Sequence, residues 1–282
     1  MNFEQIWSIV SPYTLLNRHK VRNIHRLLSQ ILANPSVHGD IGECGVFQGG
    51  ISLLMALTVA QSQVPRKVFL FDSFEGLPAP NPSADLPFYK AGSLKASLGQ
   101  VQGLLNKHEL ARHTEIYKGW FEDTLAQLPS EQRFCFLHID CDLYDSTKTC
   151  LHHLYEKIVD NGVMVFDDYF DIGGGERRAV DEFLVEHGRE LLFAGPAEQV
   201  FFFKGQQIPT SDRPNSLTFP DGTTVSLSYL IDDVDYLADL QNDALMTELP
   251  GGSLGKAAEL ACQTLKIYEY HQKILRRLKI KA

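Results

Sequence analysis

Three short apolar runs, each closed by an acidic residue, constrain the fold of this 282-residue chain most strongly. They are KVFLFD at 67–72, FCFLHID at 134–140 and VMVFDD at 163–168. A continuous apolar run of this length is typical of a strand that is buried on both faces of a parallel sheet. Segments with helical apolar spacing separate the runs, so the sequence predicts βαβ crossovers and a doubly wound, mainly parallel α/β sheet.

Further elements continue this alternation on both sides of the three runs. The first 34 residues are predicted to be helical, and Asn34-Pro35 ends the helix. The Asn161-Gly162 pair is expected to stop the helix that precedes the third run. The other expected strands are 39–46, 114–118 and two short edge strands within 191–203, and the other expected helices are 52–60, 94–110, 120–128, 147–159 and 177–187.

The pattern changes beyond residue 205. The stretch 209–220 is loop-like, Pro220-Asp221-Gly222 predicts a turn between two β-prone runs, and 257–278 has the spacing of an amphipathic helix. The cations at the end of that helix could bind a partner, but they also suit the helix dipole. We therefore predict three units: an N-terminal helical lid at 1–35, a ligand-binding α/β domain at 36–205 and a C-terminal appendage at 206–282.

Charge and cysteine content narrow the class of protein. The net charge of -9, without any block of like charges, disfavours binding to nucleic acid or to anionic membranes. Basic residues interrupt the first 30 positions and no long apolar stretch occurs, so we expect neither a signal peptide nor a membrane span. Five cysteines, an odd number lying mostly in apolar runs, suit reduced thiols in a cytoplasmic protein.

The loops at the carboxyl ends of the strands are the expected ligand site, because an open parallel sheet binds its ligand there. In GECGVFQGG at 42–50, glycines such as Gly45 let the backbone approach a ligand closely. Glu43 in this loop would repel a pyrophosphate but attract a cationic amino group. The alternative for Glu43 is a solvated acid in a turn.

Two further loops complete the expected nucleotide site. In FDSFEGLP at 71–78, Asp72 ends a strand where a carboxylate can accept both ribose hydroxyls, although it could instead cap a turn. In KGWFEDTL at 118–125, Trp120 and Phe121 suit the edge of an adenine ring, and simple packing is the alternative. NAD and S-adenosylmethionine would both fit such loops.

Four carboxylates follow two of the apolar runs. Asp140 and Asp142 close one strand, and Asp167 and Asp168 close the next. If the strands are neighbours, these groups repel strongly, and raised pKa values or a hard divalent cation are the usual resolutions. Oxygen-only ligands favour Mg²⁺, Mn²⁺ or Ca²⁺ over zinc.

The base for such a site has two candidates in the sequence. Two residues apart in an extended stretch, Asp140 and Asp142 would face the same side, so one could bind metal while the other takes a proton from a substrate hydroxyl. His138 is the rival base, since imidazole is better matched to neutral pH. His138 lies inside a strand, however, which favours a core or supporting role.

Taken together, these loops resemble those of the macrocin O-methyltransferase family, whose members methylate sugar hydroxyls and related groups of natural products. The matching strings are GECGVFQGG, FDSFEGLP, KGWFEDTL, HIDCDLYDST and VFDDY, in this order across residues 40–170. Weaker similarity extends over about residues 10–190. The resemblance implies a Rossmann-like class I methyltransferase fold at 36–205 and methyl transfer from S-adenosylmethionine to a hydroxyl.

The resemblance also implies roles for individual residues. Mg²⁺ (or Mn²⁺) would be ligated by Asp140, Asp167 and Asp168, and Asp142 would be the general base. The cofactor would be held by Glu43, Gly45, Asp72 and Ser73. The expected partner is a small hydroxylated molecule, a sugar or another natural-product intermediate, and a homodimer is one assembly that the resemblance allows.

Three alternative functions remain at this stage. A metal-dependent phosphatase also uses D-x-D and a later acidic pair, but it usually carries D-x-D on its first strand. A nucleotide-sugar transferase could use D-x-D for its metal, although the glycine loop at 45–50 weakens this reading. A methyltransferase-like scaffold without activity is the third alternative, and Asp142 argues against it.

Overall fold

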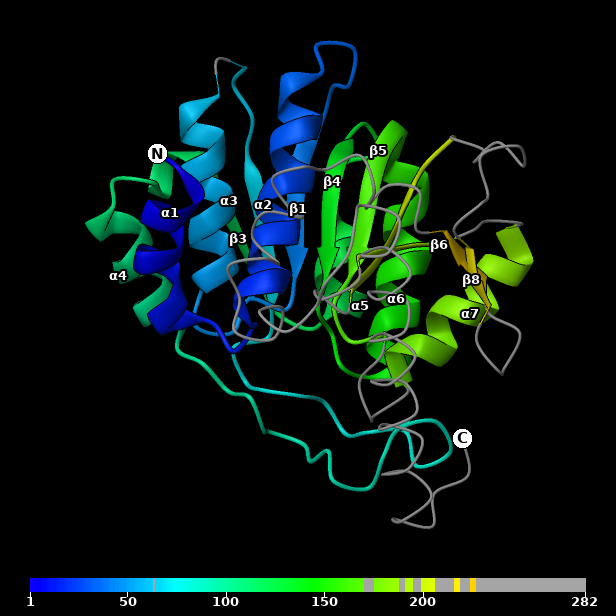
Figure 1. Cartoon of the computed structure of the whole chain (residues 1–282). Coiled ribbons are helices and arrows are strands. Elements are labelled where there is room, and N and C mark those ends of the chain that lie inside the picture. The colour runs from blue at the N-terminus through cyan, green and yellow to red at the C-terminus, as the bar shows by residue number, and fades with distance from the viewer. Residues whose placement is uncertain are drawn as a thin grey trace, which may run out of the picture.

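A single nine-stranded sheet organises the described part of the protein, with strand order β3-β2-β1-β4-β5-β7-β6-β9-β8 (Figure 1). The structure is a computed structural model that describes residues 1–62, 64–169, 175–187, 191–194, 199–205, 216–218 and 224–226. The parallel strands are β1 (Asp40–Cys44), β2 (Val68–Asp72), β3 (Thr114–Lys118), β4 (Phe134–Ile139) and β5 (Ile158–Phe166). The predicted doubly wound, mainly parallel α/β fold is confirmed.

The far edge of the sheet is mixed, because three of its four strand pairs are antiparallel and one, between β6 and β9, is parallel. Strand β7 (Gln199–Phe203) pairs antiparallel with β5 and with β6 (Leu191–Ala194), as expected for the two short edge strands. Strands β8 (Ser216–Thr218) and β9 (Thr224–Ser226) form the antiparallel pair that the β-prone runs predicted. The predicted loop at 209–220 is wrong at 216–218, which form β8. The rest of that loop, the turn at Pro220-Asp221-Gly222 and the helix expected at 257–278 lie outside the described residues.

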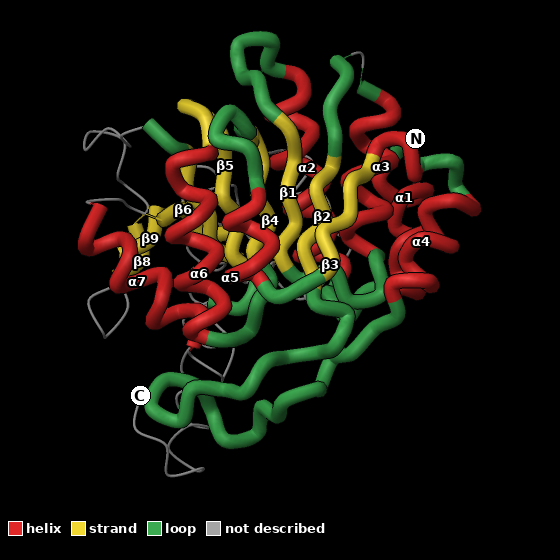
Figure 2. The backbone as a smooth tube through the Cα atoms, turned by 180° about the vertical axis from the view of Figure 1, so that it is seen from behind, coloured by secondary structure: helices red, strands yellow, loops and turns green. Residues whose placement is uncertain are grey.

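Helices cover both faces of the sheet (Figures 1 and 2). One face carries α1 (Phe3–Val10), α2 (Arg18–Ala33), α3 (Gly50–Gln61) and α4 (Leu98–Lys107). The other face carries α5 (Phe121–Thr124), α6 (Tyr144–Leu154) and α7 (Gly175–His187). Each helical layer shares a separate apolar cluster with its own face of the sheet, so the sheet is buried on both sides.

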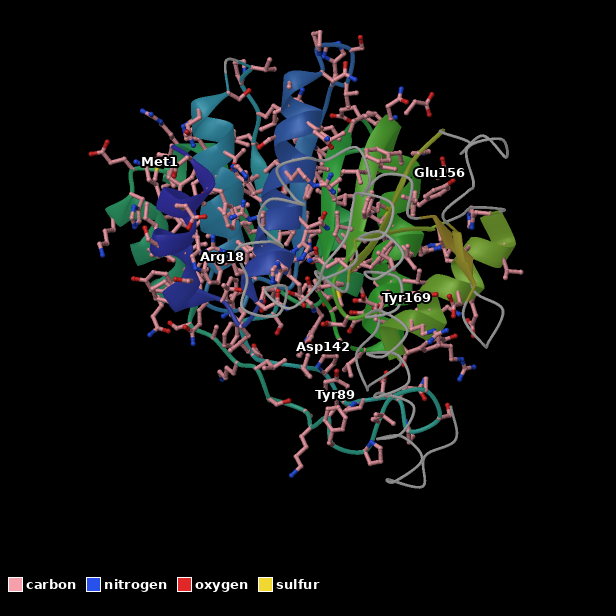
Figure 3. All side chains as sticks on the ribbon, viewed as in Figure 1. Met1, Arg18, Tyr89, Asp142, Glu156 and Tyr169 are labelled. Atoms are coloured by element: carbon pink, nitrogen blue, oxygen red, sulfur yellow. The ribbon has the colours of Figure 1, made fainter. Side chains whose placement is uncertain are left out.

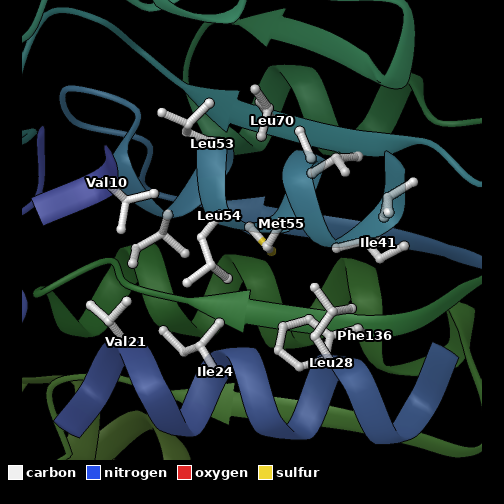
Figure 4. Close-up of a cluster of buried hydrophobic side chains, with 14 of the residues drawn as sticks. Val10, Val21, Ile24, Leu28, Ile41, Leu53, Leu54, Met55, Leu70 and Phe136 are labelled. Carbon is white, nitrogen blue, oxygen red and sulfur yellow. The ribbon is translucent and has the colours of Figure 1, made fainter. Parts of the chain in front are cut away.

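Helix α3 is the centre of the first cluster (Figure 4). Leu53, Leu54 and Met55 are consecutive and all fully buried, which no one-sided amphipathic helix allows. The helix is apolar all round because the sheet, α1 and α2 all pack against it. It also follows the glycine loop directly, so the packing of α3 fixes that loop against the sheet.

The N-terminal segment forms two helices rather than one. Pro12 lies in a 3₁₀ turn (Ser11–Tyr13) that separates α1 from α2, because proline suits the start of a helical turn but not the interior of a helix. The Asn17 side chain then caps α2 by accepting the backbone N–H of Lys20 at 2.9 Å. The predicted end of the segment at Asn34 is confirmed. The division of the whole chain into three units stays a prediction.

The prediction that Asn161-Gly162 stops a helix is wrong. Helix α6 ends at Leu154, and Asn161 lies within β5 with a φ of 62°. Its backbone N–H donates to the Lys204 carbonyl at 2.7 Å, and Gly162 accepts from the Lys204 N–H at 2.9 Å. Asn and Gly tolerate the left-handed conformation in a strand irregularity as well as at a helix end, so the local sequence signal is ambiguous.

Two observations bear on the wider predictions. Cys44, Cys135, Cys141 and Cys150 are buried free thiols, as expected, whereas Cys262 lies outside the described residues. Among the helices that the structure describes, none combines the length and the apolar character that crossing a membrane would need.

Candidate functional site

A cavity of about 520 Å³ opens at the carboxyl ends of the parallel strands. Its walls come from the loops after β1, β2, β3, β4 and β5 and from the connection between α1 and α2. All ten residues predicted from sequence line it: Glu43, Gly45, Asp72, Ser73, Trp120, Phe121, Asp140, Asp142, Asp167 and Asp168. The structure therefore brings the expected nucleotide loops and the acidic residues into one space.

The acidic residues meet because β4 and β5 are parallel neighbours. The Asp167 N–H donates to the Ile139 carbonyl at 3.0 Å, which aligns the two strand ends. Asp140, Asp167 and Asp168 each present one carboxylate oxygen, and these three atoms lie within 4.8 Å of one another. The predicted acidic cluster required the strands that end at Asp140 and Asp167 to be neighbours, and β4 and β5 are neighbours.

This cluster fits a hard divalent cation. Burial, and then the neighbouring carboxylates, raise the pKa values of Asp140 and Asp168 well above the ordinary range. One oxygen of Asp168, Oδ2, is buried and has no hydrogen-bond partner among the described residues. Three converging oxygen donors are the donor set that Mg²⁺ or Mn²⁺ prefers.

Asp167 is the most heavily bonded member of the cluster. Lys20 from α2 donates to its Oδ2 at 2.7 Å, and Gln199 from β7 donates to its Oδ1. Burial by itself would raise the pKa of Asp167, but Lys20 and then His138 outweigh it and hold that pKa well below its usual range. Sequence reasoning missed both Lys20 and Gln199.

His138 lies fully buried between two acidic side chains. Its Nε2 is 3.5 Å from Asp167 Oδ1, and its Nδ1 is 3.8 Å from Glu43 Oε1. Burial lowers the pKa of His138, but hydrogen bonding to Asp167 and Glu43 and the charge of Asp140 outweigh burial and raise it to about 10. A histidine with a raised pKa is a poor proton acceptor at neutral pH, so the geometry favours a supporting role beside Glu43 and Asp167, as the sequence position suggested.

Glu43 is buried rather than solvated, which excludes the alternative of an exposed turn acid. Ser52 from α3 donates to its Oε2. Burial raises the pKa of Glu43, while His138 and Ser52 act in the opposite direction. The Glu43 carboxyl group therefore lines the cavity and is held by Ser52 of α3 and His138 of β4.

Gly45 permits the close approach of β1 to β4 at the cavity. Its φ is 91°, and a Cβ built on it would lie 1.8 Å from the backbone oxygen of Asp140. No other residue fits this position without displacing a strand end. The glycine thereby places the first loop beside the first aspartate of the acidic cluster.

Asp72 at the end of β2 binds the backbone of two loops. Its Oδ2 accepts the N–H groups of Val46 and Phe47 at 2.7 and 3.1 Å, and its Oδ1 accepts that of Phe74 at 2.6 Å. This is the turn-capping role that the sequence left open. A carboxylate has about four lone-pair sites, so capacity for a ligand hydroxyl remains alongside these three bonds. Ser73 hydrogen-bonds within the same turn, donating to the Gly76 carbonyl at 3.0 Å.

Asp142 and the aromatic residues line the outer part of the cavity. Asp142 has a φ of 60°, so the backbone is not extended there, and the predicted alternation with Asp140 does not apply even though both side chains line the cavity. Figure 3 shows Asp142 and Tyr89, which belongs to the long loop between β2 and α4, at the same end of the molecule. Trp120 is 37% exposed at the rim, whereas Phe121 packs against the second apolar cluster.

Glu176 at the start of α7 is a further residue that sequence reasoning missed. It is fully buried, and its Oε1 accepts the backbone N–H of Asp168 at 2.8 Å. Burial first, and then the nearby acids, raise its pKa well above the usual range. Glu176 thus holds the turn that carries two of the three clustered aspartates.

Comparisons with known proteins agree with this geometry. A family model described as macrocin-O-methyltransferase (TylF) matches residues 7–192. A tetracenomycin-sugar enzyme of Streptomyces olivaceus, 8-demethyl-8-(2,3-dimethoxy-alpha-L-rhamnosyl)-tetracenomycin-C 4'-O-methyltransferase, is 32% identical over 171 residues, covering 58% of this chain and 64% of that protein. Demethyldecarbamoylnovobiocin O-methyltransferase of Streptomyces niveus is 31% identical over 172 residues, covering 56% and 63%.

Solved structures give the same picture. The O-methyltransferase NovP superposes with a TM-score of 0.61 at 27% identity, covering 69% of this chain and 83% of that one. The chain spans slightly less than two thirds of the length of both Streptomyces relatives. The matches to those two relatives therefore concern part of each protein.

Proposed function

The chain belongs to the macrocin O-methyltransferase family, and from this premise we propose that it transfers a methyl group from S-adenosylmethionine to a hydroxyl of a small molecule. Its fold is the Rossmann-like class I methyltransferase fold expected from the sequence. Family membership favours methyl transfer over the phosphatase and the nucleotide-sugar transferase that the D-x-D motif had left open. A turnover assay distinguishes an active enzyme from the scaffold alternative.

One observation carries the proposal: a single cavity is lined by the nucleotide loops and by the acidic cluster. Methyl transfer requires a cofactor sulfonium and an acceptor oxygen in near-attack geometry, and placement of this kind can lower a barrier by several kcal/mol. A cavity of about 520 Å³ lies within the range of small-molecule sites.

Cofactor binding is assigned to the loops after β1 and β2. Glu43 would attract the cationic amino group of the methionine moiety, and Gly45 lets the backbone come close to it. Asp72 and Ser73 would bind the ribose, and Trp120 and Phe121 would flank the adenine. S-adenosylmethionine, when bound there, supplies an electrophilic methyl group on a positively charged sulfur.

Asp140, Asp167 and Asp168 would hold a divalent cation, Mg²⁺ or Mn²⁺. Such a cation, when bound, lowers the pKa of a nearby hydroxyl and fixes its position. The buried Asp168 oxygen without a partner among the described residues supports this assignment, as do the raised pKa values of Asp140 and Asp168.

Asp142 would accept the proton of the acceptor hydroxyl. It lines the same cavity as the three clustered aspartates but does not belong to the group whose oxygens converge. A base beside the cation site is where proton transfer from the acceptor has to occur. The buried position of His138 between two acids, which raises its pKa, favours Asp142 over His138 for this role.

The acceptor is proposed to be a sugar hydroxyl or a related hydroxyl of a natural-product intermediate. Both Streptomyces relatives are named for O-methylation of such compounds. Tyr13 and Tyr89 line the cavity, and aromatic rings pack well against the apolar faces of sugar rings.

Isothermal titration calorimetry tests the cofactor assignment. S-adenosylmethionine, NAD and a nucleotide sugar are each titrated into the protein, with Mg²⁺ or with EDTA. We expect binding of S-adenosylmethionine alone among the three. Failure to bind it, or tighter binding of NAD or of the nucleotide sugar, would contradict the proposal.

Transfer itself is tested with S-adenosylmethionine labelled in the methyl group and a panel of hydroxylated glycosides. Transfer of the label to any acceptor would support O-methyltransferase activity. Cofactor binding without turnover on the whole panel would favour the scaffold alternative.

A further inference from the structure

A buried lysine lies within the proposed metal site. The Lys20 ammonium donates to the Asp167 carbonyl at 2.9 Å and to Asp167 Oδ2 at 2.7 Å, and it lies 3.8 Å from Asp168 Oδ1. Its side chain is only 10% exposed. A lysine is rarely buried to this extent unless anionic partners balance its charge.

A rigid element delivers this ammonium to the cluster. Lys20 lies in the first turn of α2, where the Asn17 cap fixes its backbone N–H. Val21 and Ile24, the neighbours of Lys20 on the inner face of the helix, are fully buried. The backbone of Lys20 therefore has little freedom, and only its side chain can move relative to the aspartates.

The ammonium and a divalent cation would use the same carboxylates. A cation between Asp140, Asp167 and Asp168 needs one oxygen from each, and Lys20 contacts two of these three residues. Like charges separated by a few ångström repel strongly even at the effective dielectric constant of about 20 that suits protein sites. Binding of a divalent cation must therefore displace the ammonium or tolerate this repulsion.

We propose that Lys20 is the resident counter-cation of this site. It holds Asp167 and Asp168 in place while no divalent cation is bound, and it weakens the binding of a divalent cation by repulsion. This inference rests on the metal site of the proposed function, but it does not depend on methyl transfer or on the identity of the acceptor.

The test compares Lys20→Met and Lys20→Gln with the wild-type chain. Lys20→Met removes charge and hydrogen bonds, whereas Lys20→Gln keeps an N–H donor for the Asp167 carbonyl without the charge. Lys148→Met is the matched control, because Lys148 lies on α6 with a side chain that is 52% exposed and pairs with Glu182 at 3.4 Å. Lys20→Arg, which keeps the charge, is the conservative variant.

Calorimetric titration with MnCl₂ gives the first readout. We expect both neutral variants to bind Mn²⁺ about tenfold or more tightly than the wild type, because a repelling charge has been removed. Lys148→Met and Lys20→Arg should bind within about twofold of the wild type, since the site keeps its charge. A residue with a merely structural role would instead weaken Mn²⁺ binding when removed.

Thermal unfolding gives the second readout. In EDTA the neutral variants should melt about 3 °C or more below the wild type, because the buried aspartates lose their counter-charge. Saturating Mn²⁺ should close or reverse that gap. Neutral variants that fold only in the presence of Mn²⁺ would also support the inference, because the cation would then replace the charge of Lys20.

Several results would overturn the inference. Equal or weaker Mn²⁺ binding by Lys20→Met and Lys20→Gln contradicts it, as does the absence of Mn²⁺ binding in every variant. Neutral variants that stay unfolded even with Mn²⁺ also contradict it, since the cation should replace the lysine. A wild type that binds Mn²⁺ but not S-adenosylmethionine would contradict the proposed function alone.

Discussion

Replacement of Gly45 by alanine is the perturbation whose effect follows most directly from the structure. The new Cβ would lie 1.8 Å from the Asp140 backbone oxygen, at a φ of 91° that side chains rarely adopt. To relieve the overlap, the end of β1 has to move away from β4 by about 1 Å or more, since non-bonded contacts of this kind are far longer.

That movement breaks specific hydrogen bonds. The Gly45 N–H donates to the Phe71 carbonyl at 3.0 Å, and the Asp140 N–H donates to the Cys44 carbonyl at 2.9 Å. Backbone strain of about 1–3 kcal/mol and two bonds worth about 0.5–1.5 kcal/mol each give an expected loss of about 2–6 kcal/mol in the free energy of unfolding. Gly45 follows Glu43 by two residues and lies against the Asp140 backbone. Its displacement should therefore also move Glu43 and lower the affinity for S-adenosylmethionine.

Urea denaturation monitored by tryptophan fluorescence measures the loss, and Gly103→Ala is the matched control. Gly103 lies in α4, where an added Cβ meets no atom of the described residues within 4 Å and φ is not positive. Alanine there should stabilise the protein by about 0.5–1 kcal/mol, because glycine is a poor helix former. A Gly45→Ala protein as stable as the wild type within about 0.5 kcal/mol would refute the argument from strand approach.

Three further outcomes follow from the site. Asp142→Asn should bind S-adenosylmethionine within about twofold of the wild type in calorimetry, yet lose turnover by about a hundredfold or more in the radiolabel assay. The reason is that the variant removes a base without removing one of the convergent carboxylates. Full turnover in this variant would show that Asp142 is not the base. EDTA should lower turnover and the melting temperature together, with recovery on addition of Mg²⁺, and indifference to EDTA would exclude the cation. Burial raises the pKa of Cys135 to about 11 and that of Cys141 to about 12, so peptide mapping after iodoacetamide treatment at pH 8 should find these two thiols unmodified until urea is added.

Much of the sheet could be predicted from sequence because burial on both faces leaves an unmistakable pattern. The runs ending at Asp72, Asp140 and Asp167 are continuous apolar segments, and a segment of that kind has few alternatives to a central parallel strand. The strand ends then place the acids, so the cavity residues followed from the fold. The local Asn161-Gly162 signal failed because its backbone preference is shared by two different structures.

The partners of the acidic cluster escaped prediction for a different reason. Lys20 and Asp167 are 147 positions apart, and no local pattern joins them. A signal was nevertheless present. Lys20 precedes Ile24 by four residues and Leu28 by eight, which puts a cation on the buried stripe of α2. Glu176 likewise precedes Ala179 and Val180 on the buried face of α7.

The charged side chains of Lys20 and Glu176 reach the same turn from the helical layers on opposite faces of the sheet. Lys20 comes from the helices on one face of the sheet and donates to Asp167, whereas Glu176 comes from the other face and accepts the N–H of Asp168. The short segment after β5 is therefore held by both helical layers at once. Loosening either helix should therefore disturb the proposed cation site before it disturbs the loops after β1 and β2.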